Sequence, residues 1–314
     1  MIYQVLGKSR FEVSRLCFGV LTMGPLQANF PVAKGAHLLK LAREAGVNFF
    51  DTAEYYRTYP YLKAAFSGDD RVIIATKSYA ATWDEMRVSV ERARKELNLD
   101  RIPIFLLHEQ ASAASFRGHQ GAWEYLVDAR SRGIVGAIGL STHTIEAVRV
   151  ASACPELDVI HPLFNKAGWG LMEGTAAEMA EAIQTAADMG KGIYAMKALA
   201  GGHLRGDAKA ALWFALGTRG VASVAVGMQN EEEIRFNLAV VNGEEPSSID
   251  AKAISEQRRK LHVESWCQGC GRCLGRCPFG ALTMVGDKVQ VDEGKCMVCG
   301  YCSQVCPEVA LKVL

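Results

Sequence analysis

Two stretches near the C-terminal end, CQGCGRCLGRCP at residues 267–278 and CMVCGYCSQVCP at residues 296–307, repeat one cysteine pattern. Each stretch reads C-x2-C-x2-C-x3-C-P. This spacing is typical of thiolates that bind cubane iron–sulfur clusters, in which the fourth cysteine of each run binds the cluster of the other run. The pattern therefore predicts a small electron-transfer module that holds two [4Fe–4S] clusters.

Other uses of clustered cysteines fit this spacing less well. Structural zinc sites usually take two pairs of ligands that are well separated in sequence, and disulfide frameworks belong to small chains in oxidising compartments. Residues 263–314 resemble a bacterial two-cluster ferredoxin throughout, which implies a small α+β domain. We assign a first set of ligands, Cys267, Cys270, Cys273 and Cys306, and a second set, Cys296, Cys299, Cys302 and Cys277.

Composition limits the other possibilities. The chain has 314 residues, 49% hydrophobic and 22% charged, with a net charge of +1, as expected of an ordinary globular protein of about two domains. Such a charge predicts no nucleic-acid or membrane partner. We expect no signal peptide, because the N-terminal stretch lacks a long apolar region. Reduced thiols and clusters then predict a cytoplasmic protein.

Short apolar runs alternate with amphipathic stretches from residue 16 to about residue 240, after a start that alternates like a short hairpin. The candidate strands are 16–19, 48–50, 72–76, 102–107, 135–140, 159–161, 193–196 and 221–226. The candidate helices are 33–45, 59–66, 84–97, 121–132, 144–152, 175–189, 207–217 and 230–240, and Asp84 is the expected N-cap of the third. Eight strands that are each followed by a helix predict a (β/α)8 TIM barrel. A doubly wound sheet is disfavoured, because no G-x-G-x-x-G turn follows the first strand.

The chain is thus expected to contain a barrel at 1–242, a linker with a helix at 243–262, and the cluster module at 263–314. The linker helix is expected to span 249–262, with Ser247 or Ser248 as its cap. Such a helix is about 20 Å long, enough to return the chain toward the other end of the barrel. We therefore expect the module to dock at the C-terminal ends of the barrel strands, where such barrels carry their active sites.

Polar residues follow three consecutive apolar strands at the point where each strand ends. Asp51 lies in FFDTAEYY, Lys77 ends VIIATK, and His108 ends IFLLH, while Tyr56 follows Asp51 on the same loop. A barrel carries its chemistry at the C-terminal ends of its strands. We therefore expect these four side chains to share one pocket.

Each of these residues also has a simpler explanation. A lysine after a strand is usually solvated, a histidine there is often a hydrogen-bonded core residue, and Asp51 could cap the next helix. Together, however, they form a coherent acid. The Lys77 ammonium, held by Asp51, would lower the pKa of the Tyr56 phenol. His108 would hydrogen-bond the oxygen of a carbonyl substrate.

Over roughly residues 1–242 the chain resembles the aldo-keto reductase family. The resemblance rests on D-T-A-x-x-Y, A-T-K, L-L-H, GIVGAIGLST, PLFN, IYAMKALAGG and VAVG. It implies a catalytic tetrad of Asp51, Tyr56, Lys77 and His108, with Tyr56 as the proton donor. It also implies contacts to a nicotinamide nucleotide, with Ser141 and Asn165 near the carboxamide and Asn237 near the adenine. The full set of candidate contacts is Ser141, Thr142, Asn165, Lys197, Gly227 and Asn237.

The chain departs from the family pattern at several positions. Arg57 follows the tyrosine where glycine is usual, His161 stands where glutamine is common, and Thr142 replaces a frequent asparagine. The segment that often carries basic residues for a 2′-phosphate contains three consecutive glutamates, 231–233. Because carboxylates repel phosphate, this segment favours NADH over NADPH unless a basic residue from elsewhere lies beside it.

Three functions are compatible with a barrel joined to clusters. The preferred one is reduction of a small aldehyde or ketone by hydride from NADH or NADPH, with Tyr56 as the acid and the clusters accessory or electron-relaying. In the second, the clusters feed single electrons to a bound substrate and Tyr56 supplies the protons. An external redox partner could deliver electrons to the clusters. In the third, the chain is a non-catalytic electron-transfer module, which the intact set of four rim residues disfavours.

Overall fold

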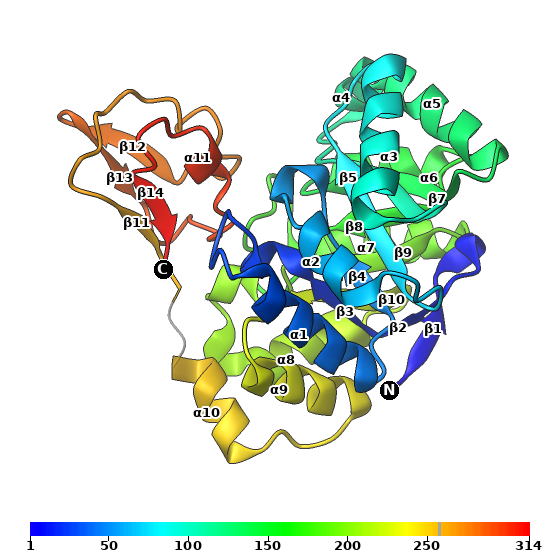
Figure 1. Ribbon diagram of the computed structural model, residues 1–314, viewed down its shortest axis with the longest axis horizontal. Helices are drawn as coiled ribbons and strands as arrows, with labels where there is room; N and C mark the ends of the chain where they lie inside the picture. Colours follow the sequence, from blue (N-terminus) through cyan, green and yellow to red (C-terminus); the bar gives the residue numbers. More distant parts are fainter. Residues whose placement is uncertain (257–258) are drawn as a thin grey trace.

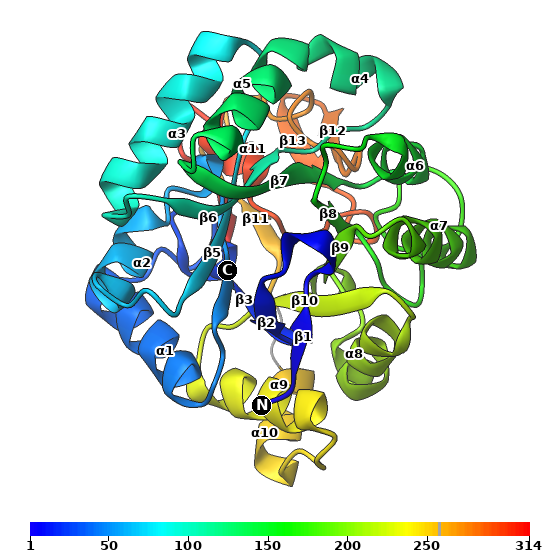
Figure 2. The same cartoon turned by 90° about the vertical axis from the view of Figure 1, so that its right-hand side faces the viewer.

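The computed structural model describes residues 1–256 and 259–314. Within these residues, eight parallel strands close a barrel in the order β10-β3-β4-β5-β6-β7-β8-β9, which confirms the predicted TIM barrel. The strands are β3 (Leu16–Gly19), β4 (Phe49–Asp51), β5 (Ile73–Ser78), β6 (Ile102–Leu107), β7 (Val135–Thr142), β8 (Val159–Pro162), β9 (Gly192–Met196) and β10 (Val221–Gly227). Figure 2 shows the helices arranged around this barrel.

The helices of the barrel follow the predicted periodicity, with one addition. They are α1 (Val32–Glu44), α2 (Tyr59–Phe66), α3 (Trp83–Leu97), α4 (Ala113–Gly118), α5 (Gln120–Ser131), α6 (Ile145–Ala153), α7 (Ala176–Asp188), α8 (Ala208–Gly217) and α9 (Glu231–Asn242). Helix α4 is not among the eight candidate helices, and Ser112 caps it. No helix in the described part of the chain is long and apolar enough to cross a bilayer.

The predicted cap of α3 is wrong. Thr82, not Asp84, is the N-cap, because its side chain accepts a hydrogen bond from the backbone amide of Glu85. The Glu85 side chain in turn accepts a bond from the backbone amide of Thr82, which completes a capping box. Asp84 instead lies in the first turn, where its negative charge favours the helix dipole.

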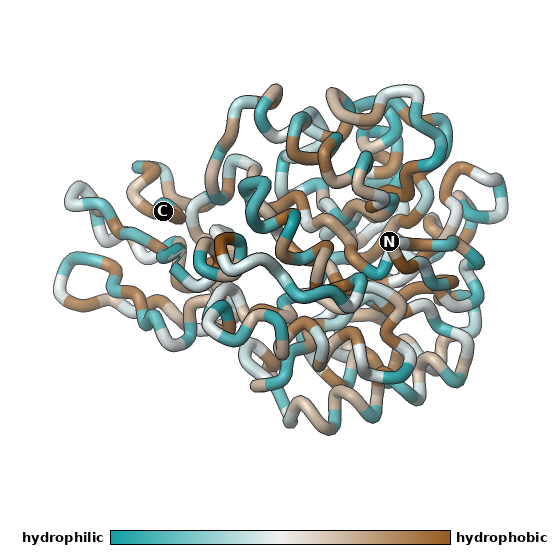
Figure 3. Tube along the Cα trace, turned by 90° about the horizontal axis from the view of Figure 1, so that it is seen from below, coloured by the Kyte–Doolittle hydropathy of each residue, from teal (hydrophilic) through white to brown (hydrophobic). Residues whose placement is uncertain are grey.

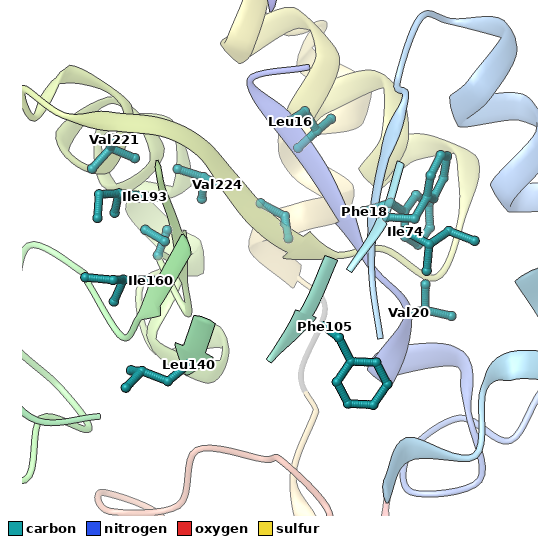
Figure 4. Close-up of a cluster of buried hydrophobic side chains, with 14 of the residues drawn as sticks. Leu16, Phe18, Val20, Ile74, Phe105, Leu140, Ile160, Ile193, Val221 and Val224 are labelled. Atoms are coloured by element: carbon teal, nitrogen blue, oxygen red, sulfur yellow. The ribbon is translucent and has the colours of Figure 1, made fainter. Parts of the chain in front are cut away.

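Alternate residues of the strands build two apolar layers. Cys17, Phe49 and Leu106 belong to the barrel interior, where they pack with Leu6 and Val13 from the N-terminal hairpin. Strand residues of the opposite orientation pack beneath the helices. Figure 4 shows part of this outer layer, with the strand residues Leu16, Phe18, Ile74, Phe105, Leu140, Ile160, Ile193, Val221 and Val224 labelled, together with Val20, which follows β3. The hairpin consists of β1 (Tyr3–Val5) and β2 (Glu12–Ser14), which pair antiparallel as expected.

The C-terminal module contains two small antiparallel sheets and a short helix. Strand β11 (Leu261–Val263) pairs with β14 (Leu311–Val313), and β12 (Leu282–Val285) pairs with β13 (Lys288–Val291). Helix α11 spans Tyr301–Gln304. Figure 1 shows this module beside the barrel in orange and red, and Figure 3 shows it projecting from the barrel when seen from below.

The linker helix is shorter than predicted. Helix α10 spans Ser248–Glu256, residues 257–258 lie outside the described residues, and Leu261 and His262 belong to β11. The predicted helix to residue 262 is therefore wrong at its end. The reason is tertiary: Leu261 is buried and pairs with Val313, so the sheet of the module overrides the local helical pattern.

The module docks on the end of the barrel where the strands finish, as expected. In Figure 2 the hairpin faces the viewer and the module lies behind the barrel, at the opposite end. The His203 Nε2 atom lies 2.9 Å from the carbonyl oxygen of Cys296, and the Gln304 amide donates a 2.6 Å hydrogen bond to the carbonyl of Tyr55. The fit is close, because a Cβ atom on Gly300 would lie 2.0 Å from the carbonyl oxygen of Leu26.

Two neighbouring glycines provide a matched test of this docking. Both have positive φ, but a Cβ on Gly201 would lie 2.6 Å from the Met297 carbonyl oxygen, whereas no described atom lies within 4 Å of one on Gly202. We expect Gly201→Ala to weaken the contact between the module and the barrel. Gly202→Ala should add only the backbone strain of a positive φ, which both variants share. Hydrogen exchange at 296–302 should increase at least tenfold more in the first variant. Equal exchange in the two variants would contradict the docking contact.

Candidate active site

The four predicted rim residues lie together. Asp51 ends β4, Lys77 lies in β5, His108 directly follows β6, and Tyr56 ends a 3-10 turn at Glu54–Tyr56. The Lys77 ammonium donates hydrogen bonds to Asp51 Oδ1 at 2.6 Å and to the carbonyl of Thr52 at 2.7 Å. The same ammonium is 5.3 Å from the centre of the Tyr56 ring. Because parallel strands end at one rim, residues far apart in sequence meet there.

The Tyr56 hydroxyl is the focus of this cluster. It lies 3.5 Å from His108 Nε2, and both side chains are buried. His108 Nδ1 has no hydrogen-bond partner within the described residues. His108 Nε2 and the Tyr56 hydroxyl are close enough for one oxygen atom to contact both.

Asp51 has partners that the sequence did not suggest. The Tyr194 hydroxyl donates a 2.9 Å hydrogen bond to Asp51 Oδ1, and His161 Nε2 lies 3.6 Å from the same oxygen. The His161 ring stacks on the Tyr194 ring at 3.8 Å. Tyr194 points into the barrel because it alternates with Ile193 and Ala195 in β9. That alternation is visible in the sequence and could have indicated that Tyr194 faces the barrel interior.

The expected effect of Lys77 on the Tyr56 pKa is wrong for this structure. Burial and the nearby Asp51 carboxylate raise the pKa of Tyr56 well above its ordinary value, and only the hydrogen bond with Tyr301 acts strongly in the other direction. Asp51 accepts a hydrogen bond from Lys77 and so balances the ammonium charge. The phenol therefore keeps its proton at neutral pH. Burial also lowers the pKa of His108, with the Lys77 charge as the second cause, so the imidazole is neutral there.

His161 provides a prediction about acid stability. Burial lowers its pKa to about 4, although Asp51 opposes the shift. Above pH 6.5 His161 is neutral in both folded and unfolded chains. As the pH falls from 6.5 toward 4, only the unfolded chain takes up the proton, so the free energy of unfolding decreases by about 3 kcal/mol. We expect His161→Gln to reduce this loss, as measured by denaturant unfolding at pH 7 and pH 4.5. Identical losses in both proteins would contradict a neutral buried imidazole.

A cavity of about 200 Å³ opens beside Tyr56 and Asp51. Its wall combines the barrel rim with the linker and the cluster module. Three of the predicted nucleotide contacts line it, namely Lys197, Gly227 and Asn237. Asn237 Oδ1 is buried without a hydrogen-bond partner within the described residues, which suits a pocket that receives a polar ligand.

The other three predicted nucleotide contacts are engaged elsewhere. The Ser141 hydroxyl accepts a hydrogen bond from the amide of Glu109, and the Thr142 hydroxyl accepts one from the amide of Thr144. The Asn165 side chain donates to the carbonyl of Trp169 at 2.8 Å and thereby closes a turn. Within the described residues, the wall of this cavity does not include them.

Two arginines that the sequence reading missed also line this cavity. Arg205 lies after β9, and Arg259 lies in the linker. Arg259 forms an ion pair with Glu233, one of the three glutamates expected to repel a phosphate. Arg259 Nε has no hydrogen-bond partner within the described residues. The sequence offered no signal for Arg259, because the linker reaches this cavity only in the folded chain.

The assignment of the cluster cysteines to two sets stays a prediction, but cysteines of each predicted set affect one another's pKa. Burial raises the pKa of Cys273, and the other three thiols of the first set raise it further. Burial likewise raises the pKa of Cys302, and the other three thiols of the second set are the next causes. The thiols of each predicted set therefore lie close enough to influence one another, and Cys273 of the first set also raises the pKa of Cys302. No group of three His, Cys, Asp or Glu side chains in the described residues could hold a single metal ion.

Lys197 connects the cavity to the second set. Its ammonium lies 3.2 Å from His143 Nε2 and 4.5 Å from the centre of the Phe279 ring. Burial lowers the pKa of Lys197, and the thiols of Cys299 and Cys277 are among the groups that oppose this shift. Cys299 itself lines the cavity. One predicted cluster ligand thus faces the same space as Tyr56.

The module also contributes side chains to the rim. The Tyr301 hydroxyl lies 3.3 Å from the Tyr56 hydroxyl and 3.4 Å from His108 Nε2. Arg276 donates hydrogen bonds to the hydroxyls of Tyr55 at 3.0 Å and Tyr79 at 3.2 Å. No local pattern in the sequence could reveal these residues, because they reach the site only through docking.

Two family models match the chain. The model described as the aldo/keto reductase family matches residues 15–209, and the 4Fe-4S dicluster domain matches residues 259–307. An uncharacterized ferredoxin of Methanocaldococcus jannaschii is 42% identical over 52 residues, which cover 16% of this chain and 84% of the ferredoxin. The C-terminal module is thus a 4Fe-4S dicluster domain of the ferredoxin type.

Similar proteins also exist for the barrel. An uncharacterized oxidoreductase of Bacillus subtilis is 27% identical over 237 residues, which cover 66% of this chain and 69% of the relative. A crystal structure of a protein from Pseudomonas aeruginosa, provisionally assigned as an aldo-keto reductase, superposes with a TM-score of 0.66 at 28% identity. That match covers 77% of this chain and 95% of the other.

Proposed function

This chain belongs to the aldo/keto reductase family, and we propose that it reduces a small aldehyde or ketone at Tyr56, with NADH or NADPH as the reductant. The observation that carries the proposal is the pairing of the Tyr56 hydroxyl with His108 Nε2 at 3.5 Å, beside a cavity that Asp51 also lines. We further propose the cytoplasm as its compartment, because the domain that binds its clusters depends on reduced thiols.

The chain's own residues position the substrate and hold the proton. A bound nicotinamide would supply hydride, and bound iron–sulfur clusters would supply electrons one at a time. A carbonyl oxygen between Tyr56 and His108 would accept hydrogen bonds from both, provided that the neutral imidazole holds its proton on Nε2. The high pKa of Tyr56 keeps its proton in place until negative charge develops on that oxygen.

Asp51 and Lys77 stabilise the Tyr56 phenolate that forms after proton transfer. Once Tyr56 has given its proton to the alkoxide, the phenolate needs a cation, and the Lys77 ammonium lies 5.3 Å from its ring. Asp51 fixes the ammonium in position through the 2.6 Å hydrogen bond. The bond that Tyr194 donates to Asp51 and the bond that the Thr52 carbonyl accepts from Lys77 complete this buried network, so little reorganisation is needed during the reaction.

The preference for NADH or NADPH depends on the charged residues in and near the cavity wall. The glutamates at 231–233 favour NADH, but Glu233 forms an ion pair with Arg259 and its charge is balanced. Arg205 and Arg259 line the cavity, and a guanidinium is well suited to hold phosphate oxygens. We therefore propose that either nucleotide can bind. Asn237 lies on the same wall and could make a polar contact to the nucleotide.

We propose two [4Fe–4S] clusters, one for each set of cysteines, as accessory or electron-relaying groups. A second function, cluster-fed one-electron reduction of the substrate, is favoured by one observation: Cys299 of the second set lines the same cavity as Tyr56. The electrons would then come from a nicotinamide nucleotide or from an external redox partner.

Anaerobic titration of the cluster-loaded protein with NADH and with NADPH tests these proposals. We expect either nucleotide to bind and to support reduction of 4-nitrobenzaldehyde, followed by the loss of nicotinamide absorbance. Cluster absorbance and low-temperature EPR should be unchanged without the aldehyde. Cluster reduction by the nucleotide alone would favour the relay, and failure to bind either nucleotide would contradict the reductase proposal.

A further inference from the structure

The Tyr301 hydroxyl lies where the carbonyl oxygen of a substrate would lie. We propose that Tyr301 is a built-in occupant of the carbonyl site, so that the docked cluster module and a carbonyl substrate exclude each other at Tyr56 and His108. This inference rests on the proposed function, because it takes Tyr56 and His108 as the groups that bind the carbonyl. The module would then act as a gate, meaning that it blocks the carbonyl site while it is docked and opens the site when it moves.

Three distances at the rim support this proposal. Tyr56 Oη, His108 Nε2 and Tyr301 Oη form a triangle with sides of 3.5, 3.3 and 3.4 Å. An oxygen that accepts hydrogen bonds from both Tyr56 and His108 must lie about 3 Å from each. Positions about 3 Å from both atoms form a ring around the line that joins them, and the Tyr301 hydroxyl occupies the part of this ring on the module side. A carbonyl oxygen can bind on that side only after the Tyr301 hydroxyl leaves.

The Tyr301 side chain is held in place from several sides. It is only 3% exposed, and the Arg276 guanidinium lies 4.9 Å from the centre of its ring. The Tyr55 ring packs edge-on against it at 5.2 Å, and the Tyr55 hydroxyl donates a 3.2 Å hydrogen bond to the Tyr301 carbonyl. Rotation of the side chain alone would meet these neighbours, so the segment that carries it must move.

That segment belongs to the cluster module. Tyr301 begins helix α11 and lies between Cys299 and Cys302, both in the second set of predicted cluster ligands. Gly300 packs against the backbone of Leu26, so displacement of this segment also undocks the module locally. Access to the carbonyl site is thus coupled to the position of a cluster-binding loop, which a bound cluster would hold in shape.

Kinetics of two variants, both cluster-loaded full chains, test the gate. With 4-nitrobenzaldehyde as the probe, we expect Tyr301→Ala to lower KM at least tenfold. We expect Tyr301→Phe to change KM less than threefold, because the ring still fills the site. If both variants instead lose kcat to the same degree as Tyr56→Phe, Tyr301 is part of the proton path and the gate is overturned. Unchanged cluster absorbance in Tyr301→Phe controls for folding.

A binding measurement separates the gate from the reaction. Calorimetry should show that phenol binds Tyr301→Ala at least tenfold more tightly than the wild-type protein, because only the variant has a permanently vacant site of that shape. Adding Tyr56→Phe should weaken phenol binding about fivefold, the effect of one lost hydrogen bond. If phenol binds Tyr301→Ala but no protein reduces the aldehyde, the proposed function fails and the gate stands. If the aldehyde is reduced but phenol does not bind Tyr301→Ala, the gate fails and the proposed function stands.

Discussion

Tyr56→Phe should lower kcat for reduction of 4-nitrobenzaldehyde by about 10²- to 10⁴-fold, because it removes the proton donor for the developing alkoxide. The effect should be equally large in the Tyr301→Ala background, where the site is open. The cluster absorbance should stay the same, because Tyr56 makes no hydrogen bond to a cysteine within the described residues. Steady-state kinetics under anaerobic conditions measure the change.

A matched control exists elsewhere in the same core. Tyr59 is also a buried tyrosine, and its hydroxyl lies 2.7 Å from the hydroxyl of Thr76. Tyr59→Phe removes one buried hydroxyl without touching the rim, and we expect kcat to change less than threefold. Residual activity of Tyr56→Phe above one tenth of the wild-type value would remove Tyr56 from the role of acid.

Lys77→Met should lower the free energy of unfolding by about 3–5 kcal/mol and abolish reduction of the aldehyde. Lys77 is fully buried and Asp51 is 5% exposed, so the variant leaves a carboxylate without its cation in the core. Tyr194 and His161 would be the remaining partners of Asp51. Denaturant unfolding, followed by fluorescence, measures the loss in the barrel.

The double variant Asp51→Asn/Lys77→Met provides the control for this effect. Removing both charges leaves no unpaired buried ion, so part of the lost stability should return although activity remains absent. If the single and double variants are equally unstable, the loss comes from packing of the lysine chain, and the pair does not act as a buried ion pair.

Much of the barrel site could be predicted from local sequence. Asp51, Lys77 and His108 each end an apolar strand, and the rule that parallel strands deliver their ends to one rim brings them together without further information. The fold followed from the same alternation of strands and helices. Even the error at the start of α3 was avoidable, because Thr82 and Glu85 already show the spacing of a capping box.

Other features depend on contacts between distant segments. The pKa of Tyr56 could not be predicted from residue types, because it depends on burial and on how fully Asp51 balances Lys77. Arg259 and Tyr301 belong to the linker and the module, and no periodicity in the sequence places them at the rim of another domain. The end of α10 was misjudged for the same reason, since Leu261 pairs with a strand 50 residues later.

Deuterium transfer tests the central claim, hydride reduction of a carbonyl at Tyr56, most directly. The cluster-loaded protein is supplied anaerobically with 4-nitrobenzaldehyde and with NADH or NADPH that carries two deuterium atoms at C4, and the alcohol is examined by mass spectrometry. We predict one deuterium on the benzylic carbon of the product. An alcohol formed by the protein without deuterium would contradict the claim, because its hydrogen would then come from water after transfer of single electrons.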